Sequence, residues 1–564
     1  MMMEQYRNLD ISELPLSSPF FRDKVSRFLE ASGLRTDALD TYYGVLDPAG
    51  ELLAGAGLSA DIIKCVAVSE EVRSEGLLTP LVSRIIQDAS LRGIHNLKVF
   101  TKPQYGPLFG SLGFKMLAEA PQAVLLENGR GLVSYCDYLR SQARRGRSGV
   151  VVMNANPFTL GHRYLLSEAL KQVDTLYVIP VREDVSMFSY SERKAMIEAA
   201  GLGKRLVVLD GSSYTISAAT FPTYFLKDLS AASEQQMRLD IDLFAKHIVP
   251  ALGVSVRFVG SEPSDSLTAR YNSLMKELLP VEVVEIERLK LDGNYVSASA
   301  VRDSICSGSF EKASALVPEP SCPYLLSKLA ERALRIELDT PLKPGLVCPD
   351  SPGAHKDMDY SVMLKGIEAI EPYFVPMAMA GNAEELQRLG IEAEKAMMSA
   401  TGGVNTHRGA IYAFGMVLNA LAREMQSPDR QAFIQNACRE NAESILRSSL
   451  NGSELHFTQE TRGARAQALT GYKQLFEDWL PFYRAGKDVK KLLLHIMSTL
   501  DDTCIVHRAG EKRALEVKKE AGELLKDFDE DRLQHMCSVF REENISPGGA
   551  ADMLALTIFI DSVI

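Results

Sequence analysis

Several short runs of consecutive apolar residues stand in the middle of the chain, separated by amphipathic segments. Runs that stay apolar at successive positions are typical of strands buried on both faces of a sheet. In the segment 163–173, by contrast, one helical stripe contains Leu165, Leu166, Ala169, Leu170 and Val173. This alternation predicts a parallel sheet wound by helices on both sides, an α/β Rossmann-like fold. The predicted strands are 149–154, 175–181, 205–209, 254–260 and 281–286.

The residues before and after this region follow different patterns. Before it, 42–46, a run beginning at Leu52, and 62–68 are predicted strands, and 77–91 has helical spacing, so we expect an α+β domain. After it, strand signals are scarce, and we expect an all-α helical domain. Its predicted helices are 327–338, 360–373, 383–396, 409–423, 429–448, 488–499 and 512–525.

Two segments predict where the domains end. Residues 140–149 are basic and contain glycine, and residues 317–323 hold three prolines, so both are interpreted as linkers. A chain of 564 residues is too long for one ordinary core, since domains usually have about 100–200 residues. We therefore predict three domains, at residues 1–145, 146–318 and 319–564.

The composition limits the possible partners and compartment. The net charge of −11 argues against a general affinity for nucleic acid or anionic membranes. No apolar stretch reaches the roughly 18 residues of a membrane span, and residues 1–10 lack the pattern of a signal peptide. The eight cysteines form no CxxC pair, so we expect reduced thiols, a cytoplasmic protein and no structural metal.

Candidate phosphate ligands follow the first predicted strand of the middle domain. Thr159, Gly161 and His162 come where a helix starts beyond the carboxyl end of that strand, which is where parallel sheets bind ligands and helix amides meet anions. Gly161 allows a close approach of the backbone. For these residues alone, an ordinary helix cap at Thr159 and a surface histidine are an equally good interpretation.

A second group of polar residues lies near the end of the same predicted domain. Ser297, Ser299 and Arg302 place two hydroxyls and a guanidinium at a helix start, which suits a triphosphate. Arg193, at another helix start, either adds positive charge to such a site or is a solvated arginine on a helix face.

The TxGH and later SxSxxR patterns together resemble the adenylyl-transferring nucleotidyltransferase superfamily. The longer stretches VVMNANPFTLGHRYLL, SYTISAATFPTYF, RFVGSEP and NYVSASAVRDSI resemble the citrate lyase ligases, which are acetate:SH-acyl-carrier-protein ligases. This resemblance implies that ATP and acetate give acetyl-adenylate and pyrophosphate, and that the thiol of an acyl carrier protein then takes the acetyl group. It also implies Mg²⁺, phosphate-binding roles for His162, Ser297, Ser299 and Arg302, and a loop-orienting role for Thr159.

The first predicted domain resembles the GNAT acetyltransferase fold, through residues 66–68, 73–78 and 105–114. In that fold, the backbone amides of an R/Q-x-x-G-x-G/A segment cradle the pyrophosphate of acetyl-CoA. Arg73 and Gly76 match this pattern, but Leu78 replaces its last small residue and would crowd the phosphates. We therefore expect a structural or carrier-docking role rather than active acetyl transfer.

Polar segments interrupt the predicted helices of the last domain at residues 340–359, 401–409, 501–508 and 546–552. Their carboxylates suit Mg²⁺, a hard ion that prefers oxygen, and their cationic side chains suit the phosphates that the metal would bridge. Glycine pairs before a helix offer amides to an anion. Each segment alone is also explained as a helix cap or a surface loop, but together they favour one shared site.

The stretches TPLKPGLV, GAHKDMD, TGGVNTHRGAI, DDTCIVHRAG and SPGGAADMLALT resemble the triphosphoribosyl-dephospho-CoA synthase family. The resemblance implies that the ribose 2′-hydroxyl of dephospho-CoA attacks C1 of the ATP ribose and that adenine leaves. A carboxylate near the reacting atoms would help such a glycosyl transfer. Candidates for metal ligand or base are Asp357, Asp359, Asp501 and Asp502. Candidates for binding ATP or dephospho-CoA are Lys343, His355, Lys356, Asn405, His407, Arg408, Arg508, Gly548, Gly549 and Asp552.

Taken together, the two resemblances imply a fusion of two ATP- and Mg²⁺-dependent enzymes that equip the acyl carrier protein subunit of citrate lyase. One alternative is the equivalent pair of activities for malonate decarboxylase. Another is a last domain that acts as a helical metal-dependent hydrolase or as a binding module. Release of adenine that depends on dephospho-CoA would separate the transferase from the hydrolase and the binder.

Overall fold

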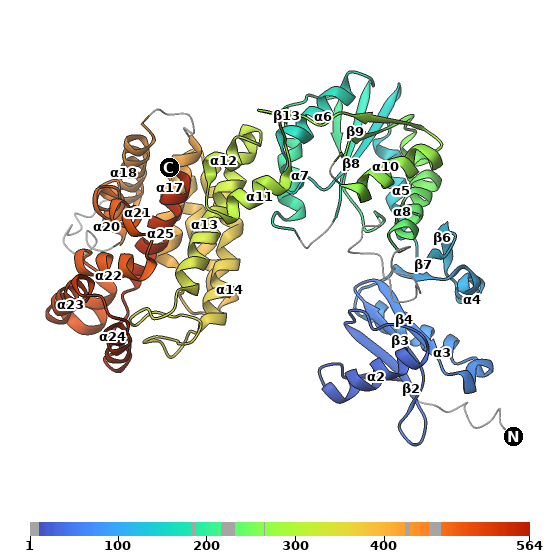
Figure 1. Cartoon of the computed structure of the whole chain (residues 1–564), viewed down its shortest axis with the longest axis horizontal. Helices are drawn as coiled ribbons and strands as arrows, with labels where there is room; N and C mark the ends of the chain where they lie inside the picture. Colours follow the sequence, from blue (N-terminus) through green and yellow to red (C-terminus); the bar gives the residue numbers. More distant parts are fainter. Residues whose placement is uncertain (1–10, 183–185, 216–231, 264, 424–428, 450–463) are drawn as a thin grey trace. The chain divides into compact units, whose positions relative to one another are not determined.

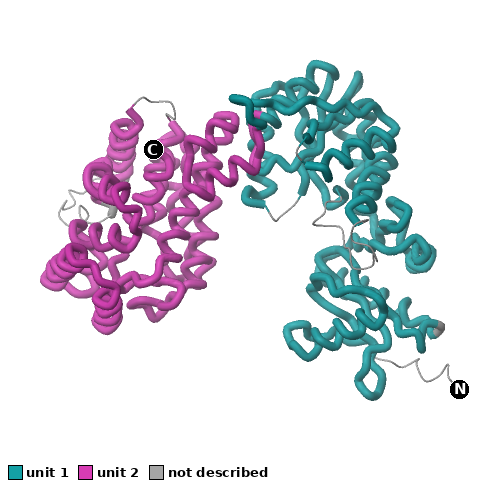
Figure 2. Tube along the Cα trace, in the orientation of Figure 1, with its two compact units in different colours: residues 1–156, 161–295 teal, residues 157–160, 296–564 magenta. Residues whose placement is uncertain are grey.

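The structure, a computed structural model, describes residues 11–182, 186–215, 232–263, 265–423, 429–449 and 464–564. Most of the SYTISAATFPTYF stretch lies outside the described residues. The chain divides into two units (Figure 2). Unit 1 contains residues 1–156 and 161–295, and unit 2 contains residues 157–160 and 296–564. The predicted three-domain division at 145 and 318 stays a prediction.

The first sheet of unit 1 has seven strands in the order β1-β2-β3-β4-β5-β7-β6 (Figure 1). Its neighbours are antiparallel except β4 and β5, which are parallel. Gly55 on β3 is required by close packing, because a Cβ there would lie 2.5 Å from the Tyr42 ring. The strands are β1 (Ile11–Leu14), β2 (Thr41–Leu46), β3 (Leu52–Ser59), β4 (Ile62–Val68), β5 (Leu97–Thr101), β6 (Lys115–Ala120) and β7 (Ala123–Asn128), and the helices are α2 (Pro19–Ala31), α3 (Leu78–Leu91), α4 (Gly106–Ser111) and α5 (Gly131–Gln142). The strands and the helix that the pattern predicted here are confirmed.

The second sheet of unit 1 is parallel throughout, with the order β10-β9-β8-β11-β12. Helices α6 and α7 lie on one side of it and α8 and α10 on the other (Figure 1). The strand order reverses between β8 and β11, and open α/β sheets bind ligands beyond the strand ends at such a point. The strands are β8 (Ser148–Met153), β9 (Thr175–Pro180), β10 (Leu206–Val208), β11 (Val256–Gly260) and β12 (Glu282–Ile286), and the helices are α6 (Leu160–Leu170), α7 (Tyr190–Glu198), α8 (Ala232–Leu243), the π-helical turn η3 (Phe244–Ile248), α9 (Val249–Leu252) and α10 (Ser266–Leu278).

The two sheets of unit 1 are joined by packing and by polar contacts. One buried apolar cluster contains residues of both, including Leu125, Leu139, Tyr177 and Leu243. Buried Lys98 on β5 donates hydrogen bonds to Asp61 at 2.8 Å and to the Ser213 hydroxyl, beyond β10, at 2.7 Å. A hairpin of β13 (Lys290–Leu291) and β14 (Asn294–Tyr295) completes the unit. Since the cluster runs through both sheets, the two are parts of one packed unit.

In unit 2, the described residues from 319 onward form helices and no β-sheet, which confirms the helical last part of the chain. Helix α25 is buried along nearly all of its length and packs against α13, α17 and α22, so it forms the centre of the core. The helices are α11 (Ala298–Cys306), α12 (Phe310–Ser314), α13 (Cys322–Asp339), α14 (Tyr360–Ile370), α15 (Phe374–Met379), α16 (Ala383–Ala400), α17 (Arg408–Arg423), α18 (Arg430–Ser449), α20 (Ala464–Leu469), α21 (Leu480–Gly486), α22 (Val489–Thr499), α23 (Thr503–Lys526), α24 (Glu530–Glu542) and α25 (Gly548–Val563), with short helical turns at Glu319–Ser321, Glu371–Tyr373 and Leu475–Trp479.

The segment 317–323, interpreted from its prolines as a linker, is packed inside unit 2. Val317 and Cys322 are buried, residues Glu319–Ser321 form a helical turn, and α13 begins at Cys322. Proline occupies the first turn of a helix without loss of a hydrogen bond, so the prolines of this segment are also compatible with helix starts. Pro320 and Pro323 both take such positions.

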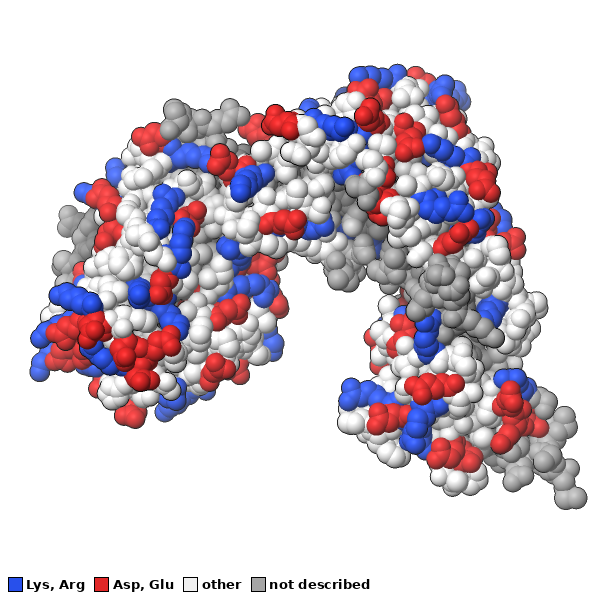
Figure 3. All heavy atoms as spheres, in the orientation of Figure 1, with Lys and Arg blue, Asp and Glu red and all other residues white. Residues whose placement is uncertain are grey.

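The surface agrees with the weak charge bias of the sequence. On the face seen in Figure 3, Lys and Arg side chains lie among Asp and Glu side chains, and neither sign forms one continuous patch in either unit. In the part of the chain that the structure describes, helices long and apolar enough to cross a membrane are absent.

Candidate active sites

The loop that follows β8 is held by Arg193, which is completely buried. Its Nη1 donates to the backbone carbonyl and the side-chain oxygen of Asn154, both at 2.8 Å, and to the carbonyl of Val181 at 2.8 Å. These contacts join the carboxyl ends of β8 and β9. The next residue in the loop, Ala155, has a φ of 50°, a conformation that costs energy for a residue with a Cβ. Arg193 therefore fixes the loop, and its contact with phosphate stays a prediction.

His162, in the first turn of α6, is half-buried. Burial, and then the nearby positive charge of Arg288, lower the pKa of His162 to about 4. The imidazole is therefore neutral at pH 7, and a neutral ring can donate one hydrogen bond to a phosphate oxygen.

Arg288 and Glu262 are residues that the sequence analysis missed. Arg288 follows β12 and forms an ion pair with Glu262, which follows β11, and its backbone amide donates to the Ser261 hydroxyl at 3.1 Å. Both follow parallel strands at the same edge of the sheet as His162. The rule that ligands bind beyond the carboxyl ends of parallel strands would have found them.

Of the other predicted ligands of the middle domain, Gly161 belongs to unit 1, whereas Thr159, Ser297, Ser299 and Arg302 belong to unit 2. Thr159 is buried. Ser297 caps α11 by accepting a hydrogen bond from the Ala300 amide at 3.1 Å, and its hydroxyl lies 3.1 Å from that of Ser299. Arg302, one turn further along α11, is half-buried. Because His162 belongs to unit 1, a common phosphate site for all of them rests on the sequence pattern alone.

In unit 2, the structure joins three of the polar segments of the last domain around His355. Its Nε2 lies 2.9 Å from the Ser546 hydroxyl, and its Nδ1 lies 3.3 Å from Arg508 Nη2. The same guanidinium donates to the side chain of Asn544 at 3.2 Å. Burial and the charge of Arg508 lower the pKa of His355. Because a guanidinium only donates, His355 Nδ1 accepts from Arg508 and its Nε2–H donates to Ser546, so the exposed guanidinium is the group suited to phosphate.

Asp502 is buried and binds the start of two helices. It caps α23 through the Cys504 amide at 2.8 Å and accepts the Ala550 amide of α25 at 2.8 Å. A Cβ at Gly549 would approach this carboxylate to 3.1 Å, so the glycine makes room for it. Burial raises the pKa of Asp502. Gly548 and Gly549 were predicted to bind a ligand. In the structure, the first turn of α25 instead donates a hydrogen bond to the side chain of Asp502.

The fourth segment meets the others at Asp552. The Ala410 amide donates to its carboxylate, and a Cβ at Gly409 would lie 1.8 Å from its Oδ2, so only glycine fits there. Burial, then the negative charges of Asp502 and Glu337, raise the pKa of Asp552 well above its ordinary value. A carboxyl group in such surroundings is a stronger base than an exposed one.

Lys343 and His407 lie deeper in unit 2 than a surface site requires. Lys343 is buried and forms an ion pair with Glu337, donating also to the Glu337 carbonyl at 2.6 Å. His407 is buried too, and burial, followed by the charge of Lys343, lowers its pKa to about 4. The sequence does not identify Glu337 as a site residue, because Glu337 looks like any other polar position of the amphipathic helix α13.

The carboxylates predicted to bind metal do not share one environment. Asp359 caps α14 through the Val362 amide at 3.0 Å, and Asp501 is exposed and paired with Lys518 at 2.5 Å. Lys356 and Asp357 are exposed, and Asp357 lies close enough to His355 to act on its charge. Among the described residues, no three His, Cys, Asp or Glu side chains gather in a group that could hold a metal ion.

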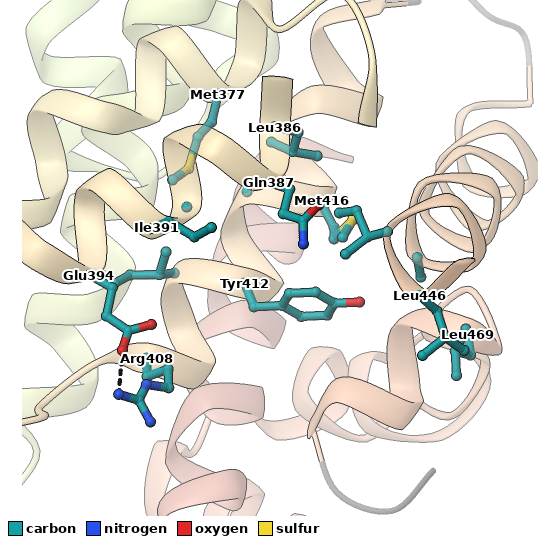
Figure 4. Close-up of a pocket in the computed structure, with 15 residues that line it drawn as sticks. Met377, Leu386, Gln387, Ile391, Glu394, Arg408, Tyr412, Met416, Leu446 and Leu469 are labelled. Carbon is teal, nitrogen blue, oxygen red and sulfur yellow. Dashed lines mark ion pairs between the residues drawn. The ribbon is translucent and has the colours of Figure 1, made fainter. Parts of the chain in front are cut away.

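A largely apolar cavity of about 260 Å³ opens beside the start of α17 (Figure 4). Tyr412 projects among side chains such as Ile391 and Met416, and the ion pair of Arg408 with Glu394 lies at one side. Arg408 is thereby engaged by a carboxylate, and the Asn405 side chain accepts the Arg408 amide at 3.2 Å. Both residues are exposed rather than inside the core, and Arg408 contributes to the cavity wall.

Known proteins match the chain in two parts. The citrate lyase ligase C-terminal domain family matches residues 148–325, and the ATP:dephospho-CoA triphosphoribosyl transferase family matches residues 323–564. The citrate (pro-3S)-lyase ligase of Klebsiella pneumoniae is 39% identical over 322 residues, which cover 55% of this chain and 94% of the relative. A Streptococcus mutans protein named "Probable 2-(5''-triphosphoribosyl)-3'-dephosphocoenzyme-A synthase" is 33% identical over 279 residues, covering 42% of this chain and 94% of the relative.

Among solved structures, an acyl-CoA N-acyltransferase from Pseudomonas aeruginosa is similar over 22% of this chain and 100% of its own, with 16% identity and a TM-score of 0.19. The sequence matches are far stronger, and each covers nearly a whole relative. The chain therefore belongs to the citrate lyase ligase family and, through residues 323–564, to the ATP:dephospho-CoA triphosphoribosyl transferase family.

Proposed function

We propose that this chain is a bifunctional enzyme that matures the acyl carrier protein of citrate lyase. One activity acetylates the thiol of the carrier's prosthetic group by way of acetyl-adenylate. The other makes 2′-(5″-triphosphoribosyl)-3′-dephospho-CoA, the precursor of that group, from ATP and dephospho-CoA. The main support is that each part of the chain spans 94% of a relative named for one of these two reactions. Because the first relatives are ligases of citrate lyase, this carrier is favoured over that of malonate decarboxylase.

The ligase activity is assigned to the parallel sheet of unit 1. A carboxylate acylates a thiol only after activation as a mixed anhydride, so the enzyme must place it in line with the α-phosphorus and neutralise the departing pyrophosphate. His162 is neutral and donates a hydrogen bond, and Arg288 adds positive charge close to it. The phosphate-binding roles of Gly161, Thr159, Ser297, Ser299 and Arg302 are part of the proposal and rest on the sequence motifs.

The transferase activity is assigned to unit 2, with Asp552 as the general base. In this reaction, the 2′-hydroxyl of dephospho-CoA forms a bond to C1 of the ATP ribose, the bond from C1 to adenine breaks, and the hydroxyl proton must be removed. A carboxylate whose pKa is raised by burial is a stronger base for that proton transfer than an exposed one. Asp502 is less suited, because its two oxygens hold the starts of α23 and α25.

The triphosphate is assigned to the cationic groups around His355. Arg508 is exposed beside it, and Lys356 is the next residue in the same loop. Asp357 supplies a hard oxygen donor close to these groups, which fits Mg²⁺ entering with ATP. When bound, Mg²⁺ neutralises part of the charge of the triphosphate. With one protein carboxylate, the phosphates and water would complete its oxygen shell.

The experiment that tests this proposal measures both products of the full chain. With ATP, Mg²⁺ and dephospho-CoA, mass spectrometry should find free adenine and dephospho-CoA enlarged by a triphosphoribosyl group, in equal amounts. With ATP and acetate, pyrophosphate should exchange into ATP. Release of ribose triphosphate without a dephospho-CoA adduct would instead make the helical part a hydrolase, and an absence of acetate-dependent exchange would remove the ligase.

A further inference from the structure

A cavity of about 230 Å³ lies within unit 1 over the parallel sheet. Met153 and Asn154 at the carboxyl end of β8 contribute to its wall, as do Ile179 on β9 and Arg257 on β11. The cavity therefore sits where the strand order reverses, next to the loop that leads to His162. Phe244 and Ile248 of the π-helical turn η3 add apolar side chains to its lining.

Arg257 is the unusual member of this lining. Its residue is only 5% exposed, yet its Nε and Nη1 lack a hydrogen-bond partner among the residues that the structure describes. Its guanidinium carbon lies 4.5 Å from the centre of the Phe244 ring. This cation–π contact stabilises the positive charge but gives the N–H groups no hydrogen-bond acceptor. Burying a guanidinium whose N–H groups make no hydrogen bond destabilises the folded protein, unless a bound ligand accepts those hydrogen bonds.

Asp240 lies in the same cavity but does not replace such a ligand. Its negative charge attracts Arg257, while its carboxylate accepts a hydrogen bond from the Tyr271 hydroxyl. The charge of Arg257 is thus partly balanced at a distance, and Arg257 remains part of the cavity lining. The parallel N–H groups of a guanidinium match the two oxygens of a carboxylate.

We propose that Arg257 binds the carboxylate of the small aliphatic acid that the ligase activates, with the acid's carbon chain against Ile179, Phe244 and Ile248. This inference rests on the proposed ligase activity. It makes Arg257 a substrate-binding residue, distinct from the phosphate-binding groups at the start of α6. A carboxylate held by a guanidinium stays ionised, which is the form that can attack the α-phosphorus. The apolar walls favour a short acid over inorganic phosphate or a nucleotide.

The test compares Arg257→Gln and Arg257→Lys with a matched control, Arg205→Gln. Arg205 belongs to the same sheet region but is exposed and donates to the carbonyls of Leu170 and Val173. At saturating ATP, the acetate concentration for half-maximal pyrophosphate exchange should rise roughly tenfold or more in Arg257→Gln, because a charged hydrogen bond is lost. It should rise less in Arg257→Lys, which keeps the charge without the fork. The control and the half-maximal ATP concentration should stay within about twofold.

Direct binding is read from saturation transfer between protein protons and the methyl protons of acetate, with α,β-methylene-ATP present. Transfer in the wild-type protein and the control, lost in Arg257→Gln, supports the site. Equal transfer in Arg257→Gln, or none in the wild-type protein, overturns it. If Arg257→Gln does not fold, Arg257→Lys decides, and binding equal to wild type overturns the site. Saturation transfer to acetate could depend on Arg257 while acetate-dependent pyrophosphate exchange is absent. That result would support the carboxylate site and contradict the proposed ligase activity.

Discussion

The carboxylate of Asp502 accepts the backbone amide of Ala550 at 2.8 Å, and so joins the start of α23 to the first turn of α25. The same carboxylate accepts the Cys504 amide of its own helix at 2.8 Å. Since α25 is the centre of the unit 2 core, this buried side chain connects the polar segments to the core.

Asp502→Ala should destabilise unit 2 by about 2–3 kcal/mol, because it removes a helix cap and leaves a buried amide without a partner. The single tryptophan of the chain, Trp479, is buried in unit 2, so its fluorescence during urea unfolding reports this unit alone. Asp501→Ala is the control: its exposed ion pair with Lys518 should be worth less than about 1 kcal/mol. Equal losses in the two variants would contradict the double cap.

Unit 2 should lose stability in acid through His407. Its pKa falls from 6.5 to about 4 in the folded chain, so the unfolded chain binds the proton more tightly. The contribution is complete above pH 6.5 and is lost as the pH falls toward 4, by up to about 3 kcal/mol. Tryptophan fluorescence in urea at a series of pH values should show a smaller acid loss in His407→Gln. His507→Gln, at an exposed residue, should keep the wild-type profile.

The two activities should be separable by single substitutions. His162→Ala should reduce acetate-dependent pyrophosphate exchange by about 10²-fold or more and leave adenine release unchanged, since a donor to phosphate is removed. Asp552→Asn should have the opposite result, reducing adenine release by about 10²–10⁴-fold because the base is lost. Both assays are run on each purified variant after circular dichroism has verified folding. A joint loss of the two activities in either folded variant would contradict separate sites.

Asp357→Asn should raise the Mg²⁺ concentration needed for half-maximal adenine release and lower the rate at limiting Mg²⁺. Its carboxylate is exposed, so the urea midpoint of unit 2 should hardly change. The comparison variant is Asp359→Asn, which keeps a side-chain oxygen to cap α14 and should retain the wild-type Mg²⁺ dependence. Normal activity of Asp357→Asn at low Mg²⁺ would exclude Asp357 as a metal ligand.

Sequence pattern predicted the sheets better than it predicted the centre of unit 2. The parallel strands of unit 1 were recognisable because they are short apolar runs, and β8, β9 and β11 are each followed by a helix. Helix α25 was missed, because it is buried on all sides and so carries no polar stripe. Two prolines of the segment 317–323 lie at helix starts, and sequence pattern alone does not distinguish that position from a linker.

The candidate sites were predictable as segments, but the environment of each side chain was not. Asp501 and Asp502 are neighbours in sequence, yet one is exposed beside Lys518 and the other is buried under α25. That difference depends on where a distant helix packs. Arg257 lies inside the predicted strand 254–260. A charged residue inside a run of apolar ones was the available signal, since buried charges need a partner.

The packing of α13 against α25 has a consequence for how the protein is made. These helices are the first long helix and the central helix of unit 2, and more than two hundred residues separate their sequences. A nascent chain leaving the ribosome can complete the sheets of unit 1 early, whereas the core of unit 2 must wait until residues 548–563 emerge. Until then, the apolar faces of the earlier helices stay open to water, so this half of the enzyme needs chaperone protection most during its own synthesis.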